Sequence, residues 1–449
     1  MAACFTVVSL GVARANGRYP ATNGFVFSPS EPDQILLRVT FGLLVSRDRG
    51  ASWDWVCEGA LRISDGEDPM YVVTPAGTLV ATTFHGVDVS RDRLCSFPAV
   101  GGPLEKRAFV DLTSRPSAPS TIVVFASTFA GDDANMVPTY DSELFETSDD
   151  AQTFTPLGSP FPNRTFLGET VDLAPSDGSR IYVTAVKNKG LENRTAHLFE
   201  SRDHGKTWTE HAVPLEGTER SLFIAGVDPN DPERVYLRTS NDFEMPTRLL
   251  VSSDGGSTTR TVFTAKSALA GFALSPDGQR VFVGSSLDGL QMARTTDLVF
   301  AQRSKIEIQC LAFSPDGLLA CSNERYGFVA GLSRDDGATF TPVLRLCNIR
   351  GPLSGCPVGS ATQFECVAGG KIGKPRWPFQ RQQFACDVPE GGRRPSDDAA
   401  IAGPGAPPEA EEGCSVDGGG ARTAMPASAG FSLVVVALLW LRRGRRSKA

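Results

Sequence analysis

Short apolar runs separated by turns rich in Pro, Asp and Gly repeat along residues 25–346. Each unit opens with an apolar stretch that ends in a turn, such as FVFSPSEPDQ from Phe25 or LAFSPDGL from Leu311. A second β-rich stretch follows, such as ILLRVT from Ile35. Runs of this length favour strands, and no stretch before residue 346 sustains the 3.6-residue period of an amphipathic helix. The pattern predicts an all-β domain.

A polar octet, Ser-x-Asp-x-Gly-x-Thr-Trp, ends the third strand of each unit, and its best copy is SRDHGKTW at residues 201–208. The Ser and Asp side chains can accept hydrogen bonds from backbone N–H groups two residues on. The Gly supplies a positive φ, the Thr suits a strand start, and the aromatic ring anchors the hairpin. We therefore expect structural turn residues at Ser46, Asp48, Gly50, Trp53, Asp92, Asp149, Phe154, Ser201, Asp203, Gly205, Thr207, Trp208, Ser252, Asp254, Gly256, Asp297, Ser333, Asp335, Gly337 and Phe340.

The octets recur at the spacing of a repeat protein. Their third-position aspartates lie 44, 57, 54, 51, 43 and 38 residues apart. A period of roughly 40–50 residues is typical of propellers and solenoids. The seven units predict a seven-bladed β-propeller with four strands per blade over residues 16–346. The weak sixth copy, at residues 295–300, leaves six or eight blades as alternatives.

The octet resembles the Asp-box, or BNR repeat, of sialidases, sortilin-type receptors, xyloglucanases and the photosystem II assembly factor family. The resemblance covers about residues 25–346. It implies a propeller in which each Asp-box hairpin lies at the edge of a blade and has a structural role. It does not imply one function, because these families do different things on one scaffold.

Both ends of the chain differ from the repeats. Residues 1–15 contain an apolar run that ends in Ala13-Arg14-Ala15, which predicts a signal peptide, with a first β-strand as the alternative. Residues 387–420 are rich in Pro and Gly and predict a flexible linker. Within residues 421–449, an apolar run at 424–441 precedes LRRGRRSKA, which predicts a transmembrane helix with a cytoplasmic C-terminus.

Cys414, a Gly-rich spacer, the apolar run and the terminal Arg cluster together resemble the myxobacterial C-terminal sorting tail (MYXO-CTERM). The resemblance implies that Cys414 is the position of processing and lipidation and that the protein is displayed on a bacterial cell surface. A plain single-pass anchor without processing is the alternative.

Eight further cysteines suit an oxidising compartment, with buried free thiols as the alternative. Cys310 and Cys321 flank a turn and predict a cross-strand disulfide, which a bulge at Gly317 would weaken. An inter-blade bridge between Cys57 and Cys95 is our hypothesis for that pair. The remaining four predict a small appendage over residues 347–386 with three possible internal connectivities. They are Cys347, Cys356, Cys366 and Cys386.

The candidate chemistry is sparse. No CxxC pair exists and the histidines His85, His197, His204 and His211 are not clustered with cysteines, so we expect no metal site and no cofactor. His204 lies inside an octet and predicts an exposed turn residue. The net charge of −7 argues against a nucleic-acid partner.

Catalytic sets of the related families are not recognisable. A sialidase needs an arginine cluster, a Tyr nucleophile with a Glu, and an Asp. No Arg-Ile-Pro motif occurs, and the residues that could reach the channel or lie on strands form no set: Arg38, Arg238, Tyr71, Tyr182 and Tyr236. A xyloglucanase-like cleft forms between two propellers, and this chain has length for one. We assign no catalytic residue.

These observations predict an exported propeller, anchored at the envelope, that binds or scaffolds a protein or glycan without catalysis. The longest insertions before an octet, at residues 130–142, 188–195 and 240–246, are our hypothesis for a recognition rim. A sialidase-like exo-glycosidase and an assembly factor for a membrane complex are the alternatives.

Overall fold

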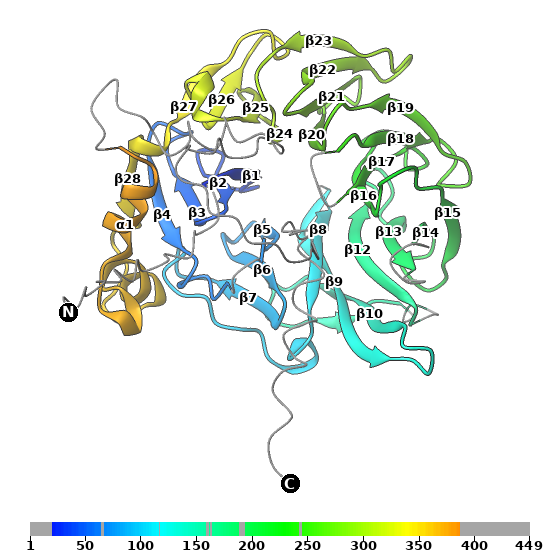
Figure 1. The fold of residues 1–449 in the computed structure, drawn as a ribbon. Coiled ribbons are helices and arrows are strands. Elements are labelled where there is room, and N and C mark those ends of the chain that lie inside the picture. The colour runs from blue at the N-terminus through cyan, green and yellow to red at the C-terminus, as the bar shows by residue number, and fades with distance from the viewer. Residues whose placement is uncertain are drawn as a thin grey trace, which may run out of the picture.

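The computed structural model describes residues 20–63, 67–115, 117–158, 161, 164–187, 194–241 and 245–386. Seven β-sheets are arranged radially around a central axis (Figure 1). In this part of the chain, no helix is long and apolar enough to cross a bilayer. The predicted signal peptide, linker, transmembrane run and Cys414 lie outside the described residues.

Each sheet, or blade, uses strands that are consecutive in sequence. Blades 1 and 2 contain β1 (Thr22–Phe27), β2 (Ile35–Val39), β3 (Gly42–Ser46), β4 (Trp53–Cys57), then β5 (Tyr71–Val73), β6 (Leu79–Thr83) and β7 (Gly86–Ser90). Blades 3 and 4 contain β8 (Phe109–Arg115), β9 (Ala118–Asp132), β10 (Pro138–Thr147), β11 (Thr155–Pro156), then β12 (Phe166–Leu173), β13 (Ile181–Lys187), β14 (Thr195–Ser201) and β15 (Thr209–Val213).

Blades 5, 6 and 7 follow the same plan. They contain β16 (Ser221–Val227), β17 (Val235–Ser240), β18 (Arg248–Ser252), β19 (Arg260–Thr264), then β20 (Leu269–Leu274), β21 (Arg280–Ser285), β22 (Gly289–Arg294), β23 (Ala301–Ser304), and β24 (Cys310–Ser314), β25 (Gly317–Cys321), β26 (Ala330–Ser333), β27 (Thr341–Leu344). The short remaining elements are η1 (Gly102–Leu104), η2 (Glu324–Tyr326), η3 (Leu346–Asn348), β28 (Ile349–Pro352), η4 (Gln363–Val367), η5 (Gly370–Ile372) and α1 (Arg376–Gln383).

Seven blades are confirmed, but the expectation of four strands in each is wrong for two of them. Blade 2 has three assigned strands. A single bridge between Asp88 and Ala99 stands in for its fourth strand. Pro98 has no N–H to donate, so a regular ladder cannot continue there. Blade 1 instead has five strands, because β28 adds to its outer edge.

The core lies between neighbouring blades. Leu198 and Val186 of blade 4, for example, share a fully buried cluster with Leu222 and Leu237 of blade 5. The innermost strands of blades 1, 3, 4 and 6 each contain a register shift near the start of the strand, and that of blade 5 contains one near its end. A bulge of this kind bends the strand and re-aims a side chain, and Glu169 occupies one of these positions.

The octets form turns that share one hydrogen-bond network. In the fourth octet, Ser201 Oγ donates to Asp203 Oδ1 (2.9 Å) and accepts from Gly205 N (2.8 Å). Asp203 accepts from the N–H and hydroxyl of Thr207 at 2.8 and 2.7 Å. The Ser and Asp side chains therefore accept mainly from N–H groups four residues on, whereas the sequence predicts acceptance from N–H groups two residues on. The network recurs around Asp48, Asp149, Asp254 and Asp335.

Three octets depart from this geometry, and in the third Ala151, with φ of 59°, takes the place of the glycine. In the second, Leu94 takes the place of the glycine with φ of 73°, and its N–H still reaches Ser90 Oγ at 3.0 Å. In the sixth, Asp297 accepts only the N–H of Val299, at 3.0 Å, among the bonds of the described chain. The glycine of the seventh octet is required for space as well as for φ, because a Cβ on Gly337 would overlap Leu290 of blade 6.

The ring closes without exchanging a strand between its first and last blades. After blade 7 the chain crosses to blade 1, where β28 pairs in parallel with β4. Arg350 donates two hydrogen bonds, of 2.9 and 2.6 Å, to the carboxylate of Asp54 in β4. In the appendage, residues 347–386, Trp377 then packs against Trp55, with 5.4 Å between the two ring centroids. Figure 1 shows α1 and β28 beside β4 at the outer edge of the ring.

All eight predicted cysteines form disulfides. Cys310 and Cys321 are directly opposed in the β24–β25 ladder, which has no register shift at Gly317, so this prediction is confirmed. The predicted Cys57–Cys95 bridge is wrong, and the appendage does not pair only within itself. The other three bridges are Cys57–Cys366, Cys95–Cys356 and Cys347–Cys386.

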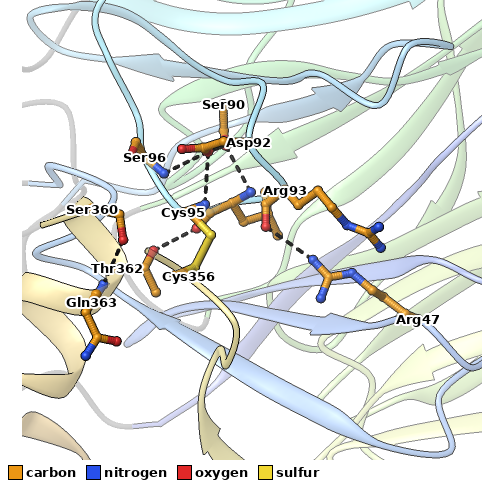
Figure 2. The surroundings of a disulfide bond; sticks show 11 residues. Arg47, Ser90, Asp92, Arg93, Cys95, Ser96, Cys356, Ser360, Thr362 and Gln363 are labelled. Carbon is orange, nitrogen blue, oxygen red and sulfur yellow. Dashed lines mark hydrogen bonds between the residues drawn. A yellow bond between two sulfur atoms is a disulfide. The ribbon is translucent and has the colours of Figure 1, made fainter. Parts of the chain in front are cut away.

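The bridges of Cys57 and Cys95 fasten the appendage to blades 1 and 2. Figure 2 shows Cys95–Cys356 with Thr362, whose N–H donates to Cys95 O (3.0 Å) and whose hydroxyl donates to Leu94 O (2.7 Å). The sequence misses both partners because they are 309 and 261 residues away. The appendage is thus part of the propeller's closure.

Candidate functional site

The two faces of the ring differ in which connections they carry. Strands alternate in direction within each blade, so the connections from first to second and from third to fourth strand share one face. This face carries the octets, and we call it the octet face. The connections from second to third strand, and from each blade to the next, share the opposite face. We call it the mouth face.

Exposed apolar side chains collect on the mouth face. Among the described residues of the blades, the exposed large hydrophobic side chains are Phe84, Phe129, Met136, Met245, Leu287, Val299 and Tyr326. All of these except Val299 lie in or beside a connection between second and third strands. They come from blades 2, 3, 5, 6 and 7.

The predicted recognition rim lies on this face, but its first member is not a loop. Residues 130–142 belong mostly to the hairpin of β9 and β10, whose tip turns at Asp133. Asp133 Oδ1 accepts the N–H groups of Asn135 and Val137 at 2.8 and 2.9 Å. The exposed Met136 sits on that tip. Of the other two segments, residues 188–193 and 242–244 lie outside the described chain.

Two arginines approach the inner strands near the mouth. Arg38 lies opposite Gly24 of β1, where the missing side chain leaves room for the guanidinium, and donates to Asp68 O (3.4 Å). Arg238 donates to Leu269 O of the next blade (3.0 Å) and lies 5.1 Å from the Phe223 ring centre.

Burial, first, and then the charge of Arg38 lower the pKa of Arg238. Neither guanidinium lies within 4.0 Å of a carboxylate of the described residues. The buried Arg180 and Arg248, by contrast, each form a close ion pair with a glutamate.

The sequence missed the buried carboxyls near these arginines. Burial raises the pKa of Asp111 and of Glu169 to about 7. Asp111 accepts the N–H groups of Leu112 and of Val171 in the next blade, both at 2.9 Å. Glu169 accepts the N–H of Leu222, again in the next blade, at 3.0 Å. These carboxyls therefore connect the inner strands of successive blades.

Tyr71, Tyr182 and Tyr236 do not form one site. Tyr71 is buried beside Arg38, and burial raises its pKa. Its hydroxyl has no hydrogen-bond partner among the described residues. Tyr182 instead donates to Pro232 O at 2.7 Å between blades 4 and 5, and burial raises the pKa of Tyr236 to about 12.

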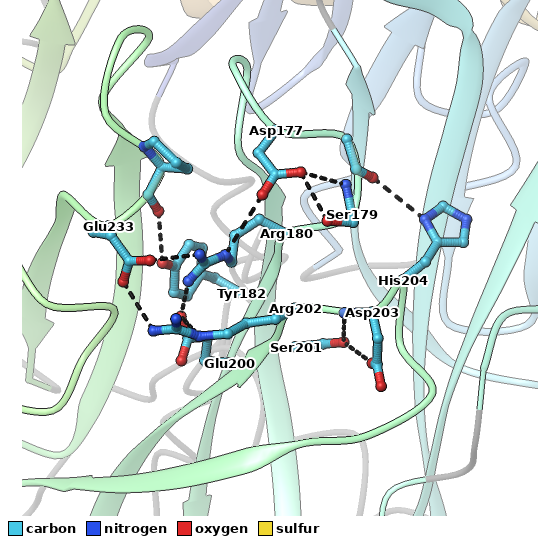
Figure 3. Close-up of polar contacts among 12 residues, drawn as sticks. Asp177, Ser179, Arg180, Tyr182, Glu200, Ser201, Arg202, Asp203, His204 and Glu233 are labelled. Carbon is cyan, nitrogen blue, oxygen red and sulfur yellow. Dashed lines mark hydrogen bonds and ion pairs between the residues drawn. The ribbon is translucent and has the colours of Figure 1, made fainter.

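A polar cluster on the octet face joins blades 4 and 5 (Figure 3). Arg180 pairs with the buried Glu200 and with Glu233 of the next blade. Arg202 contacts the same two carboxylates at 3.1 and 3.0 Å. Every charge in the cluster has an opposite partner, which is typical of a structural ion-pair network.

The histidines also serve contacts between strands. His204 was predicted to be exposed, but it is half-buried and lies 3.1 Å from Glu146 of blade 3. His197 lies 2.9 Å from Glu210 on the adjacent strand. No group of three or more metal-ligating side chains occurs in the described part of the chain.

Comparison with known proteins gives no family for the chain and only distant structural neighbours. No family model and no curated protein matches the chain. A GH74 enzyme of Niastella koreensis aligns with 72% of this chain at 13% identity and a TM-score of 0.39, and the chain spans 65% of that enzyme. Hydrazine synthase of Kuenenia stuttgartiensis aligns with 68% at 10% identity and a TM-score of 0.46, over 93% of its chain.

Proposed function

We propose that this protein is a non-catalytic binding propeller, exported and tethered to a bacterial envelope, that holds a protein partner on its mouth face. The observation that carries the proposal is the one-sided distribution of exposed apolar side chains. Apolar side chains that gather on one exposed face are the kind of surface that protein association buries. Six of the seven described examples in the blades lie on the mouth face.

The residue types of this face suit the same role. Aromatic residues and Met are enriched at protein interfaces, and the mouth face exposes Phe129, Met136 and Tyr326. The buried carboxyls that could serve catalysis are already engaged by backbone amides. We therefore favour binding over turnover.

The proposed location rests on the two termini and the cysteines. Four disulfides suit an exported protein. The hydrogen bonds of the octets support membership of the Asp-box propellers. The tail at residues 421–449, with Cys414 as the lipidated residue, would attach the propeller to the envelope.

Site-specific photo-crosslinking tests the proposed face. A photoreactive amino acid replaces Met136, Leu287 or Val299 in the full chain, which is expressed in its own cell. Val299 is the matched control, since it is 73% exposed on the octet face, against 68% for Met136 and 65% for Leu287. We expect one protein adduct from both mouth positions and none from Val299. Equal labelling from all three would overturn the proposal.

An exo-glycosidase is the second candidate, because Asp111 and Glu169 are carboxyls with pKa values near the range of a general acid at neutral pH. A panel of fluorogenic glycosides tests it. Turnover that Glu169→Gln abolishes and Asp203→Asn preserves would establish a hydrolase. A glycan bound without turnover would replace the protein partner with a sugar, and a co-purifying membrane complex would favour an assembly factor.

A further inference from the structure

We propose that the appendage is a second, separate contact surface that docks on an anionic phospholipid bilayer. This inference rests on the membrane tether of the proposed function, but it assigns a different surface from the mouth face. It joins three features of residues 358–383: exposed apolar side chains, a local excess of cations, and the place where the tail begins.

The appendage is rich in exposed apolar side chains. Of the twelve large hydrophobic residues that are exposed in the described chain, five belong to these few residues: Val358, Phe364, Val367, Ile372 and Phe379. Val358 and Ile372 are 95% and 74% exposed. The inward side of the same segment is well packed, since the Trp377 ring lies 5.4 Å from the Trp55 ring of blade 1, measured between ring centroids. The exposed set is therefore not a consequence of a poorly formed core.

The charge of the segment opposes that of the whole chain. Residues 358–383 contain four cations and one acid, in a chain whose net charge is −7. The acid, Glu365, is already paired with Arg376 at 3.5 Å. Lys371 and Lys374 are exposed on either side of Ile372. Cations beside inserted apolar side chains are the combination that anionic bilayer surfaces attract.

The position of the appendage in the chain selects a bilayer over other occupants. Residue 387, the first of the predicted linker, directly follows the appendage. The proposed tether is therefore attached here, and not to either face of the ring. Figure 1 places α1 at the outer edge of blade 1. Contact through this edge would leave the channel mouth free for a partner.

Vesicle flotation combined with amide hydrogen exchange tests the inference. The purified full chain is mixed with preformed vesicles of phosphatidylcholine alone, or of phosphatidylcholine with phosphatidylglycerol. We expect amides of residues 358–383 to exchange more slowly only with the anionic vesicles, and high salt to remove this difference. The double variant Lys371→Glu/Lys374→Glu should partition more than about thirty-fold more weakly into anionic vesicles, since loss of two cations alone costs about that much and the reversed charges add repulsion.

Matched variants separate the appendage from general effects. Ile372→Ser/Phe379→Ser should lose the exchange difference, while Val299→Ser with Lys206→Glu, equivalent changes on the octet face, should retain it. Failure of the tether would appear as no flotation with neutral vesicles. Failure of the inference would appear as identical exchange of residues 358–383 with both vesicles. Slow exchange that depends on protein concentration without vesicles would overturn it in favour of a second copy.

Discussion

In five of the octets the hydroxyl at the first position connects the ends of the turn, because it donates to the Asp and accepts from the backbone N–H four residues on. Ser201 is almost fully buried while doing so. Ser201→Ala should leave the N–H of Gly205 without a partner and lower the free energy of unfolding by about 1–3 kcal/mol. Urea denaturation monitored by tryptophan fluorescence measures this loss.

Ser96→Ala is the matched control. Ser96 lies in the second octet, and its hydroxyl makes no hydrogen bond among the described residues. Its removal should change the unfolding free energy by less than about 0.5 kcal/mol. Equal losses in the two variants would contradict the role given to the first octet position.

Glu169 should give the fold a dependence on pH. Burial raises its folded pKa to about 7, from an ordinary value of 4.5. The folded state therefore holds the proton more tightly, and this contribution to stability is complete below about pH 4.5 and is lost as the pH rises through 7. The size is on the order of 2–3 kcal/mol. Glu169→Gln should reduce the rise in unfolding free energy between pH 8 and 5, and Asp111, whose pKa is raised likewise, should supply part of what remains.

Asp203→Asn serves as the control for that titration. The hydroxyl and N–H of Thr207 lower the pKa of Asp203 to about 2. Its stabilisation is present above the unfolded pKa near 4 and is lost only as the pH falls toward 2. The variant should keep the wild-type slope between pH 8 and 5. A flat wild-type profile over that range would refute the role of Glu169.

The sequence predicts hydrogen bonds within one turn better than it predicts side chains that are buried between two blades. The octet residues were identifiable because each network lies within eight residues. Asp111 was not, because its raised pKa comes from burial between two blades. A usable signal was present: Val-Asp-Leu recurs at residues 110–112 and 171–173, which places a carboxyl inside an apolar inner strand.

At the scale of elements, β28 is the part that closes the ring. It holds the outer edge of β4 through two backbone pairs and the Arg350–Asp54 ion pair. Cys95–Cys356 reinforces the same junction, and with Cys57–Cys366 intact it closes a loop of roughly 50 residues. Removing it as Cys95→Ser/Cys356→Ser should lower the unfolding free energy by roughly 4 kcal/mol in the chain-entropy model.

The matched pair is Cys310→Ser/Cys321→Ser, which opens a bridge of sequence separation 11 inside one hairpin. Its expected loss is smaller, roughly 3 kcal/mol. It should also leave amide exchange in β28 unchanged, whereas loss of Cys95–Cys356 should accelerate it. If amides of β28 exchanged faster in both variants, the Cys95–Cys356 disulfide would have no specific effect on β28.

The elements were predictable where their partners are near in sequence. The β24–β25 ladder and its disulfide follow from one turn. The pairing of β28 with β4 does not, because nothing local in residues 349–352 indicates which distant edge they join. The sequence predicts residues 130–142 as an insertion, whereas β9 and β10 extend through most of them, because the polar tip shows no apolar alternation that would indicate strands.

For the whole molecule, the repeat period predicts the number of blades but not their relative stability. Blade 2 has the shortest inner strand, Tyr71–Val73, and no regular fourth strand. Blade 3, by contrast, contains the two longest strands of the described chain, β9 and β10. Local opening is easiest where few backbone hydrogen bonds must break together. Blade 2 should therefore be the first blade to open.

Native-state hydrogen exchange of the intact chain measures this order. Amides of β6 should exchange about tenfold faster than those of β9, each compared with its own unfolded reference rate. Since Cys95 joins blade 2 to the appendage, mild reduction should widen the difference in β6 before it affects blades 4 and 5. Uniform protection around the ring, reduced or oxidised, would show that the blades open only together and that closure is a property of the entire ring.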